Sequence, residues 1–211
     1  MPRPSLPIAV IHLDESCLGN GREGQTPGGA AGLIEVRLRH GIERRDFYLH
    51  AADTTNNRMA LAGAIAALQL LARKGRRFRV MVVSDSEYLV KGMREWVPSW
   101  IQRNWRRKGG AIENLALWRA LVETAWSHEV QWTWVRGHTG HVKNEYANDL
   151  AVAAATEQKT SEGAMPSGLS AWLGAKQARG LYPDYDPDAS FATAERLVAS
   201  DEPLPIAEAV E

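Results

Sequence analysis

The sequence predicts an α/β fold with a mixed five-stranded sheet, three antiparallel strands followed by two parallel ones, flanked by helices. Two observations support this fold class. Three runs of β-forming residues, at 8–13, 33–38 and 42–49, follow one another with only turns between them. Two further runs, at 78–84 and 130–135, each come after a segment with helical spacing. Strands joined by turns pair antiparallel, whereas strands joined through a helix pair parallel, so the two sets predict the two halves of the sheet.

The helices are expected where apolar residues recur every three or four positions. After residue 57, Met59, Ile65 and Leu68 fall at that spacing, and residues 54–56 offer polar caps for the helix start. Further helices are expected at 86–92, 112–127 and 144–157, with a Trp- and Arg-rich segment between the first two of them. The resulting order is βββαβααβα.

The chain is expected to have three parts. Residues 1–7 hold three prolines and predict an unstructured lead-in, residues 8–158 form the domain, and residues 159–211 form an acidic extension that contains proline and glycine. Two short helices are expected in the extension, at 170–178 and 189–199. Its role stays open at this point: it could dock on the domain and supply an acid such as Asp184 or Asp186, cover the basic face, or be mobile.

Charge is distributed unevenly along the chain. Residues 157–211 carry ten acidic and four basic residues, which leaves 21 basic and 15 acidic residues in the first 156. A basic body favours a polyanionic partner, because lysine and arginine displace counterions from phosphates. The single Cys17 excludes an internal disulfide, and no apolar stretch is long enough to cross a bilayer. We therefore expect a soluble, cytoplasmic monomer that needs neither a membrane nor a small-molecule cofactor.

Two aspartates are placed where β-forming runs end. Asp14 follows the first run and Asp85 follows the fourth. If these strands are parallel neighbours, both carboxylates lie at the carboxyl edge of the sheet, where α/β folds usually bind ligands. Oxygen ligands of this kind suit Mg²⁺, with Mn²⁺ as the alternative. The competing interpretation is that each aspartate only caps the turn that follows it.

Five local motifs occur in a fixed order along the chain. They are Asp14-Glu15-Ser16-Cys17-Leu18-Gly19-Asn20; Thr54-Thr55-Asn56-Asn57-Arg58-Met59; Ser84-Asp85-Ser86; the Trp- and Arg-rich segment 94–108; and Gly137-His138-Thr139-Gly140-His141 with Asn144-Glu145. Together they resemble the type 1 ribonuclease H family, over about residues 8–157. The resemblance implies a ribonuclease H-like fold and endonucleolytic cleavage of the RNA strand of an RNA/DNA hybrid with two divalent metal ions.

The resemblance also implies roles for single residues. Asp14 would be shared by both ions, Asp85 would bind one of them, and His138 would assist proton transfer or product departure. His141 is expected only to bond to the backbone. Two of the four carboxylates usual in the family are replaced, by Ala60 and Asn148.

Three nearby acids could compensate for the replaced carboxylates. They are Glu15, Glu145 and Asp149. Asp149 is rotated by about 100° around the helix from position 148, so Glu15 is the better substitute and is expected to be a catalytic metal ligand. Asn148 can still offer a carbonyl oxygen to the metal, although it adds no charge.

Binding of the hybrid is expected at two places. By the resemblance, Asn20, Asn56 and Asn57 match positions that contact the hybrid, and Thr55 matches a DNA-phosphate contact. The second place is the basic, aromatic segment with Trp105, Arg106, Arg107 and Lys108. Within that segment Trp96 and Trp100 are expected to belong to the core. Asp53 and Glu87 place negative charge near the proposed phosphate path.

Three functions therefore remain open from the sequence. The first is a metal-dependent ribonuclease H with a carboxylate set rearranged around Asp14, Asp85 and Glu15. The second is a catalytically impaired module that binds RNA/DNA hybrids on the same fold. The third is a different phosphodiester reaction on this fold, since fold alone does not fix function.

Overall fold

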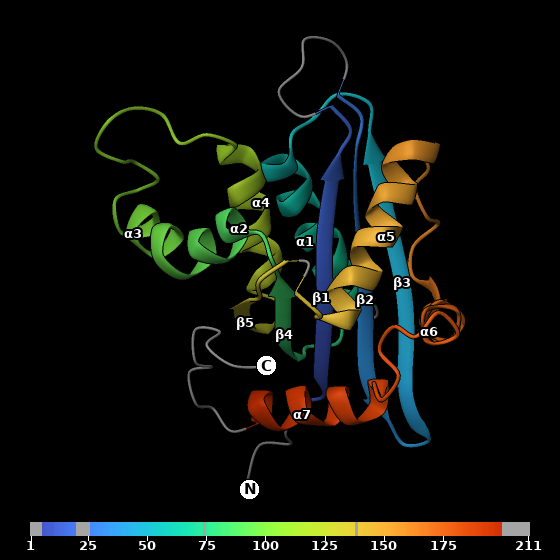
Figure 1. Cartoon of the computed structure of the whole chain (residues 1–211). Helices are drawn as coiled ribbons and strands as arrows, with labels where there is room; N and C mark the ends of the chain where they lie inside the picture. The colour runs from blue at the N-terminus through green and yellow to red at the C-terminus, as the bar shows by residue number, and fades with distance from the viewer. Residues whose placement is uncertain (1–5, 20–25, 74, 138, 200–211) are drawn as a thin grey trace, which may run out of the picture.

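The structure, a computed structural model, describes residues 6–19, 26–73, 75–137 and 139–199 (Figure 1). Its strands are β1 (Ile8–Cys17), β2 (Gly28–Leu38), β3 (Gly41–Ala51), β4 (Arg79–Ser84), β5 (Glu129–Trp134) and β6 (Met165–Pro166). They form one sheet in the order β5-β4-β1-β2-β3-β6. β2 pairs antiparallel with β1 and β3, whereas β4 pairs parallel with β1 and β5. The predicted mixed sheet of five strands is confirmed, and a two-residue sixth strand from the extension is added to it.

The helices are α1 (Asn56–Ala72), α2 (Glu87–Lys91), the π-helical segment η1 (Gly92–Trp96), α3 (Val97–Gln102), α4 (Leu115–Ala125), α5 (Val142–Glu157), α6 (Leu169–Gln177) and α7 (Pro187–Ala199). The helices expected from periodicity are all present. The helix expected at 86–92 continues through η1 and α3, so much of the Trp- and Arg-rich segment is helical. Within the described residues, no helix is both long and apolar enough to cross a membrane.

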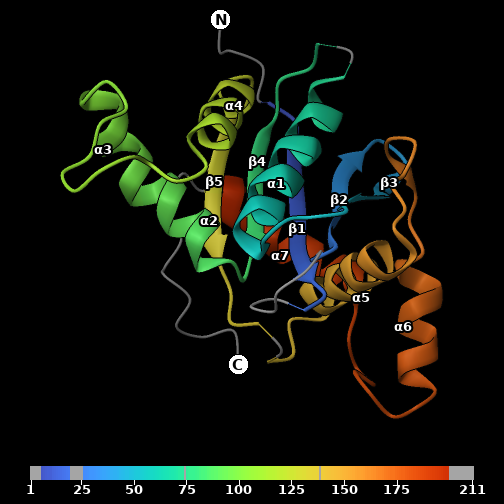
Figure 2. The same cartoon turned by 90° about the horizontal axis from the view of Figure 1, so that it is seen from above.

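Helices cover both faces of the sheet (Figure 2). Ala9, Ile11 and Leu13 of β1 pack in the core beneath α1 and α4. Val10 points to the opposite face, which α5 and α7 cover. Since side chains alternate along a strand, odd positions of β1 face α1 and even positions face α5 and α7. This alternation decides from which side each residue at the end of β1 reaches the site.

The extension packs against the domain at α7. Phe191 and Val198 of α7 are fully buried against an apolar patch of β1 and β4, made of Val10, Met81 and Val83. Glu195 of α7 forms an ion pair with Arg37 of β2 at 2.7 Å. The extension therefore completes a second hydrophobic core on the sheet face opposite α1.

The extension also runs along the outer edge of β3. β6 pairs with Arg45 and Asp46. Further along, the Tyr48 carbonyl accepts from the Ser161 amide at 2.9 Å, and the His50 amide donates to Thr160 Oγ1 at 3.1 Å. Between Arg44 and His50, backbone groups of β3 that face away from β2 are thus bonded within the chain.

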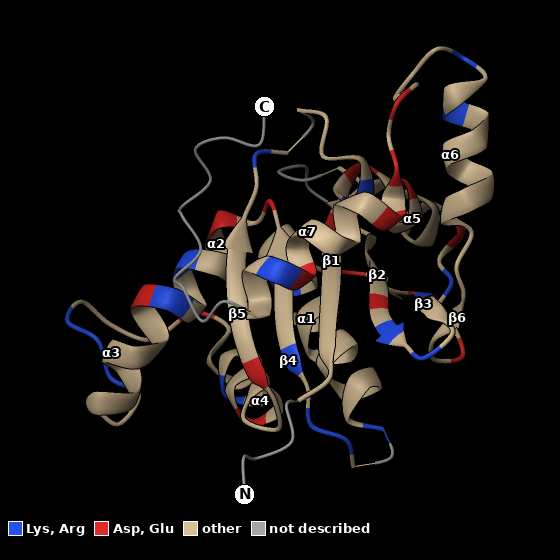
Figure 3. Cartoon of the chain, turned by 90° about the horizontal axis from the view of Figure 1, so that it is seen from below, with Lys and Arg blue, Asp and Glu red and all other residues tan. Residues whose placement is uncertain are grey.

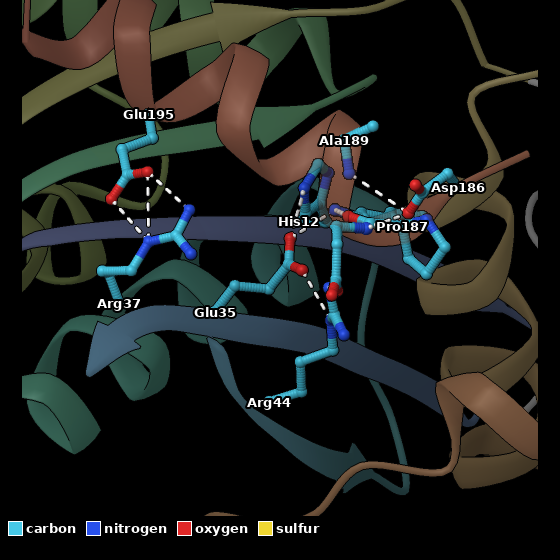
Figure 4. A network of polar contacts seen from close by, with 10 residues as sticks. His12, Glu35, Arg37, Arg44, Asp186, Pro187, Ala189 and Glu195 are labelled. Atoms are coloured by element: carbon cyan, nitrogen blue, oxygen red, sulfur yellow. Dashed lines mark hydrogen bonds and ion pairs between the residues drawn. The ribbon is translucent and has the colours of Figure 1, made fainter. Parts of the chain in front are cut away.

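A buried carboxylate, Glu35 of β2, organises polar contacts between the sheet, α5 and α7 (Figure 4). Its side chain is fully buried, and it accepts from Lys143 Nζ at 2.7 Å and from Arg44 Nε at 2.8 Å. His12 Nε2 lies 3.5 Å away. Lys143 Nζ also donates to the Pro187 carbonyl at 2.9 Å, so the network reaches the start of α7. Such a charge is tolerated in the interior because several donors satisfy it.

This network predicts a loss of stability in acid. Burial alone would raise the pKa of Glu35 from 4.5, but the hydrogen bond from His12 and the charge of Lys143 lower it to about 2. The folded state therefore keeps Glu35 ionised at pH values at which Glu35 of the unfolded chain is protonated. Stability from this group is present above pH 4.5 and is lost as the pH falls toward 2. We expect the free energy of unfolding to fall by about 3 kcal/mol over this range from Glu35 alone.

Urea unfolding of the wild type and of Glu35→Gln at a series of pH values measures this contribution. The variant cannot titrate at this position, so its stability should depend less steeply on pH. Parallel pH profiles for the two proteins would contradict the assignment.

Candidate active site

Three carboxylates meet at the carboxyl edge of the sheet. The ligand oxygens of Asp14, Glu15 and Asp85 all lie within 4.8 Å of one another. We call these residues the carboxylate cluster. The parallel pairing of β1 with β4 ends at Leu13 and Ser84, so Asp14 and Asp85 each follow the last paired residue of neighbouring strands. The expectation that the first strand ends before Asp14 is wrong, because β2 continues to pair with β1 as far as Cys17.

Asp14 and Glu15 enter the carboxylate cluster from opposite faces of the sheet. Asp14 shares the α5 face of β1 with Val10 and is 6% exposed, whereas Glu15 shares the α1 face with Ile11 and Leu13. Because β4 pairs no further than Leu13, no strand separates the two carboxylates on that side. Both side chains therefore approach Asp85 although they are neighbours on one strand.

The electrostatics of the carboxylate cluster favour a bound cation. Burial and the charge of Asp85 raise the pKa of Asp14 to about 8. Burial and the charges of Asp14 and Asp85 raise the pKa of Glu15 to about 8, against an opposing hydrogen bond with Ser86. Burial and mutual repulsion disfavour the ionised form of all three acids at once, and a positive charge among them offsets that cost. An all-oxygen donor set of this kind fits a hard divalent metal ion.

Helix α5 places one amide side chain, that of Asn144, next to the carboxylate cluster. Asn144 is buried, its Nδ2 donates to the Leu13 carbonyl at 3.0 Å, and its side chain hydrogen-bonds to Asp14. The sequence motif contained Asn144, but no role was predicted for it. Asn148 is half-buried one turn further along α5, on the same side of the helix. Ala60, by contrast, is buried in the core on α1.

Gly137, which follows β5, lies against Asp85. A Cβ added at Gly137 would be 2.3 Å from Asp85 Oδ2, so only glycine allows this approach. Trp134 Nε1 donates to the Asp85 carbonyl at 3.0 Å and fixes the backbone there. The predicted catalytic residue His138 lies outside the described residues. His141 closes the loop as the N-cap residue of α5, and burial lowers its pKa.

The other acids considered as substitutes are bonded elsewhere. Glu145 accepts from the Gly140 amide at 3.1 Å, and Asp149 accepts from Trp172 Nε1 at 2.8 Å. Asp186 Oδ1 accepts from the Asp188 amide at the start of α7. Neither these three acids nor Asp184 belongs to the carboxylate cluster in the described part of the chain. Only Glu15 among the candidate substitutes joins Asp14 and Asp85.

The predicted hybrid-binding residues of the second motif lie at the start of α1. Thr55 is the N-cap residue, and its side chain accepts from the Arg58 amide at 3.3 Å. Asn56 and Asn57 form the first turn. Asn56 Oδ1 is buried and has no hydrogen-bond partner among the described residues. Asn20, the remaining residue of this predicted set, lies outside the described residues.

The basic, aromatic segment projects from the side of the molecule at α3 (Figure 3). Arg106, Arg107 and Lys108 are exposed, and Trp105 is half-buried with the Arg119 guanidinium 5.5 Å from its ring centre. Trp100 is 9% exposed in the main core. Trp96 packs against that core, which confirms the expectation that both tryptophans are core residues.

The negative charges expected near the phosphate path are partly offset. Glu87 forms an ion pair with Lys91 at 2.7 Å. Asp53 is exposed and accepts from Thr26 Oγ1 at 3.3 Å. Because Lys91 offsets its charge, Glu87 repels a bound polyanion less than an unpaired glutamate would.

Comparison with known proteins gives a consistent family assignment. A sequence model described as RNase H matches residues 7–156. The chain is 40% identical over 146 residues to a protein named Ribonuclease H from Methylococcus capsulatus, a match that covers 69% of this chain and 87% of the relative. It is 43% identical over 142 residues to a Ribonuclease H from Aromatoleum aromaticum, covering 67% of this chain and 86% of the relative.

A solved structure extends the similarity beyond the sequence match. The crystal structure of LC9-RNase H1, described as a type 1 RNase H with the type 2 active-site motif, aligns with a TM-score of 0.75 and 51% sequence identity. The alignment covers 82% of each chain. With the fold and the family motifs in agreement, the chain belongs to the ribonuclease H family.

Proposed function

We propose that this protein hydrolyses the RNA strand of RNA/DNA hybrids endonucleolytically, with divalent metal ions bound at the carboxylate cluster. The observation that carries the proposal is the convergence of Asp14, Glu15 and Asp85 in a member of the ribonuclease H family. The relatives at about 40% identity are named as ribonucleases, and none of them supports the alternative of a catalytically impaired hybrid-binding module.

The chain's own residues would prepare the site for this reaction. Divalent ions, when bound, would activate a water molecule and stabilise the oxygen that leaves the scissile phosphate. We assign Asp14, Glu15 and Asp85 as metal ligands and the Asn148 side-chain carbonyl as the fourth, with Mg²⁺ preferred over Mn²⁺. The Asn144 contact fixes Asp14 in advance, which reduces the reorganisation needed at reaction. His138 is the proposed group for proton transfer.

Glu15 is the proposed replacement for the glutamate absent at position 60. It reaches the carboxylate cluster from the face of the sheet on which α1 carries Ala60. A carboxylate from β1 can therefore take the place of one from α1 without a change in the fold. The description of LC9-RNase H1 as carrying a different active-site motif supports such an exchange in a similar chain.

Replacement of Glu15 by glutamine is expected to lower kcat at least about tenfold, because one anionic ligand is lost, at a cost of about 1.4 kcal/mol or more. Cleavage assays at saturating Mg²⁺ measure the rate, and titration calorimetry with Mn²⁺ measures the accompanying loss of metal affinity. Glu162→Gln, an exposed change of the same kind in the extension, is the matched control. A rate unchanged by Glu15→Gln would show that Glu15 is not a ligand.

The hybrid would lie across two surfaces. We propose that Asn20, Thr55, Asn56 and Asn57 contact it near the scissile bond, and the exposed Thr55 and half-buried Asn57 at the start of α1 support this. The exposed cations Arg106, Arg107 and Lys108, with Trp105, would hold the DNA strand. We further propose a cytoplasmic monomer with no small-molecule cofactor.

A hybrid labelled on the RNA strand tests the function directly. Incubation with Mg²⁺ or Mn²⁺ should cut the RNA strand internally, while a chelator should stop the reaction. Single-stranded RNA and the matching DNA duplex should remain intact under the same conditions. Tight binding of the hybrid without cleavage at any metal concentration would overturn the proposal.

A further inference from the structure

The extension contacts helix α5 through a stacked pair of aromatic rings. Trp172 of α6 and Tyr182 lie with ring centres 6.1 Å apart and planes inclined by 22°. Trp172 Nε1 donates to Asp149 Oδ2 at 2.8 Å, and Lys176 Nζ lies 3.1 Å from the same oxygen. Asp149 of α5 thus anchors α6, and the stacking fixes the position of Tyr182. Figure 2 shows α6 beside α5.

Tyr182 reaches the first turn of α5. Its hydroxyl donates to Glu145 Oε2, and Glu145 Oε1 accepts from the Gly140 amide at 3.1 Å. Glu145 therefore connects the extension to Gly140, just before α5. Gly137, just after β5, lies against Asp85 of the carboxylate cluster.

A second contact holds the same turn of α5 from the start of α7. Lys143 Nζ donates to the Pro187 carbonyl at 2.9 Å as well as to Glu35. The residue between these two contacts is Asn144, which bonds to the Leu13 carbonyl and to Asp14. The extension thus binds the residues on both sides of Asn144.

From these contacts we propose that Tyr182 is a positioning residue for the ribonuclease reaction. Through Glu145 it fixes the backbone at Gly140 and the first turn of α5 beside the carboxylate cluster. When the backbone near the site is ordered before the substrate binds, the free-energy cost of ordering it does not add to the barrier of the reaction. Loss of the contact should therefore lower kcat. This inference rests on the proposed ribonuclease activity, which the extension would then support as part of the active enzyme.

Tyr182→Phe tests the inference, because it removes the hydroxyl and keeps the ring on Trp172. We expect kcat for hybrid cleavage to fall about fivefold while KM changes by less than about twofold. In the metal-free protein, hydrogen exchange at the Gly140 amide should become faster, since its acceptor is no longer held. Tyr48→Phe, on β3, is the control and should change neither quantity.

Variants at Glu145 separate positioning from general stability. Glu145→Gln keeps an oxygen that can accept from Gly140 and should retain most of the wild-type kcat. Glu145→Ala should reduce kcat at least as much as Tyr182→Phe, and the double variant with Tyr182→Phe should be no slower than Glu145→Ala alone.

The inference is overturned if Tyr182→Phe leaves kcat unchanged, or if kcat falls without faster exchange at Gly140. The failure of the proposed function looks different, because the wild type itself would then not cleave the hybrid. In that case the exchange measurement still decides whether Tyr182 holds the backbone at Gly140.

Discussion

Asp14→Asn is expected to lower the rate of hybrid cleavage at least about a thousandfold at saturating Mg²⁺, a barrier increase of about 4 kcal/mol. Asp14 is the most buried member of the carboxylate cluster and lies against both Glu15 and Asp85. Asparagine keeps the size and one oxygen of the side chain but removes its charge. The variant therefore tests the anionic ligand rather than the packing around it.

A stability measurement distinguishes loss of chemistry from loss of fold. The raised pKa of Asp14, about 8, shows that its ionised form is disfavoured by burial and by Asp85. The neutral asparagine removes this repulsion, so without metal the variant should be at least as stable as the wild type at pH 8 and above. Addition of Mg²⁺ should raise the melting temperature of the wild type more than that of the variant.

Glu43→Gln is the control for this experiment. Glu43 lies near the start of β3, and β3 runs in the same direction as β1, so Glu43 is at the opposite end of the sheet from Asp14. The control should retain wild-type cleavage. Substantial metal-dependent activity in Asp14→Asn would contradict the role assigned to the carboxylate cluster.

Phe191→Ala is expected to lower the free energy of unfolding by about 3–5 kcal/mol, because it leaves a cavity in the second hydrophobic core. Phe191 is fully buried beneath the sheet, against residues of β1 and β4. The Arg37 guanidinium also lies 5.2 Å from the centre of its ring. Among the described residues of the extension, Phe191 is the largest side chain that is fully buried.

Urea unfolding followed by circular dichroism measures the effect. Trp126→Ala is the matched aromatic control, because Trp126 is 72% exposed and its removal should change stability by no more than about 0.5 kcal/mol. A similar small change for Phe191→Ala would show that the packing of α7 contributes little to the fold. A chain shortened at Lys159 would expose the whole apolar patch beneath α7, so we expect it to be less stable still.

Much of the fold could be predicted from the sequence because its signals are local. The run of β-forming residues at 8–13 and the helical spacing after Asn57 are both local patterns, and both predicted elements are present. The proximity of Asp14 to Asp85 could be predicted because it follows from parallel pairing of two strands. Their roles as ligands remain predictions.

Other features depend on contacts that no local pattern encodes. The continuation of β1 beyond Asp14 arises because β2 supplies a partner as far as Gly28. The packing of α7 on the sheet could not be predicted in this way. It depends on an apolar patch that forms only when β1 and β4, which are distant in sequence, lie side by side. Glu35 interrupts an apolar run in β2, which signals a buried charge, but its partners come from β1, β3 and α5.

The path of the extension along β3 has a consequence for solubility. An uncovered outer strand presents free amides and carbonyls that can recruit a strand from another molecule, which is a common first step of aggregation. Here β6 and the residues on either side of it occupy such groups between Arg44 and His50. The extension thereby blocks edge-to-edge association along this stretch, and its removal would leave β3 as a template for intermolecular pairing.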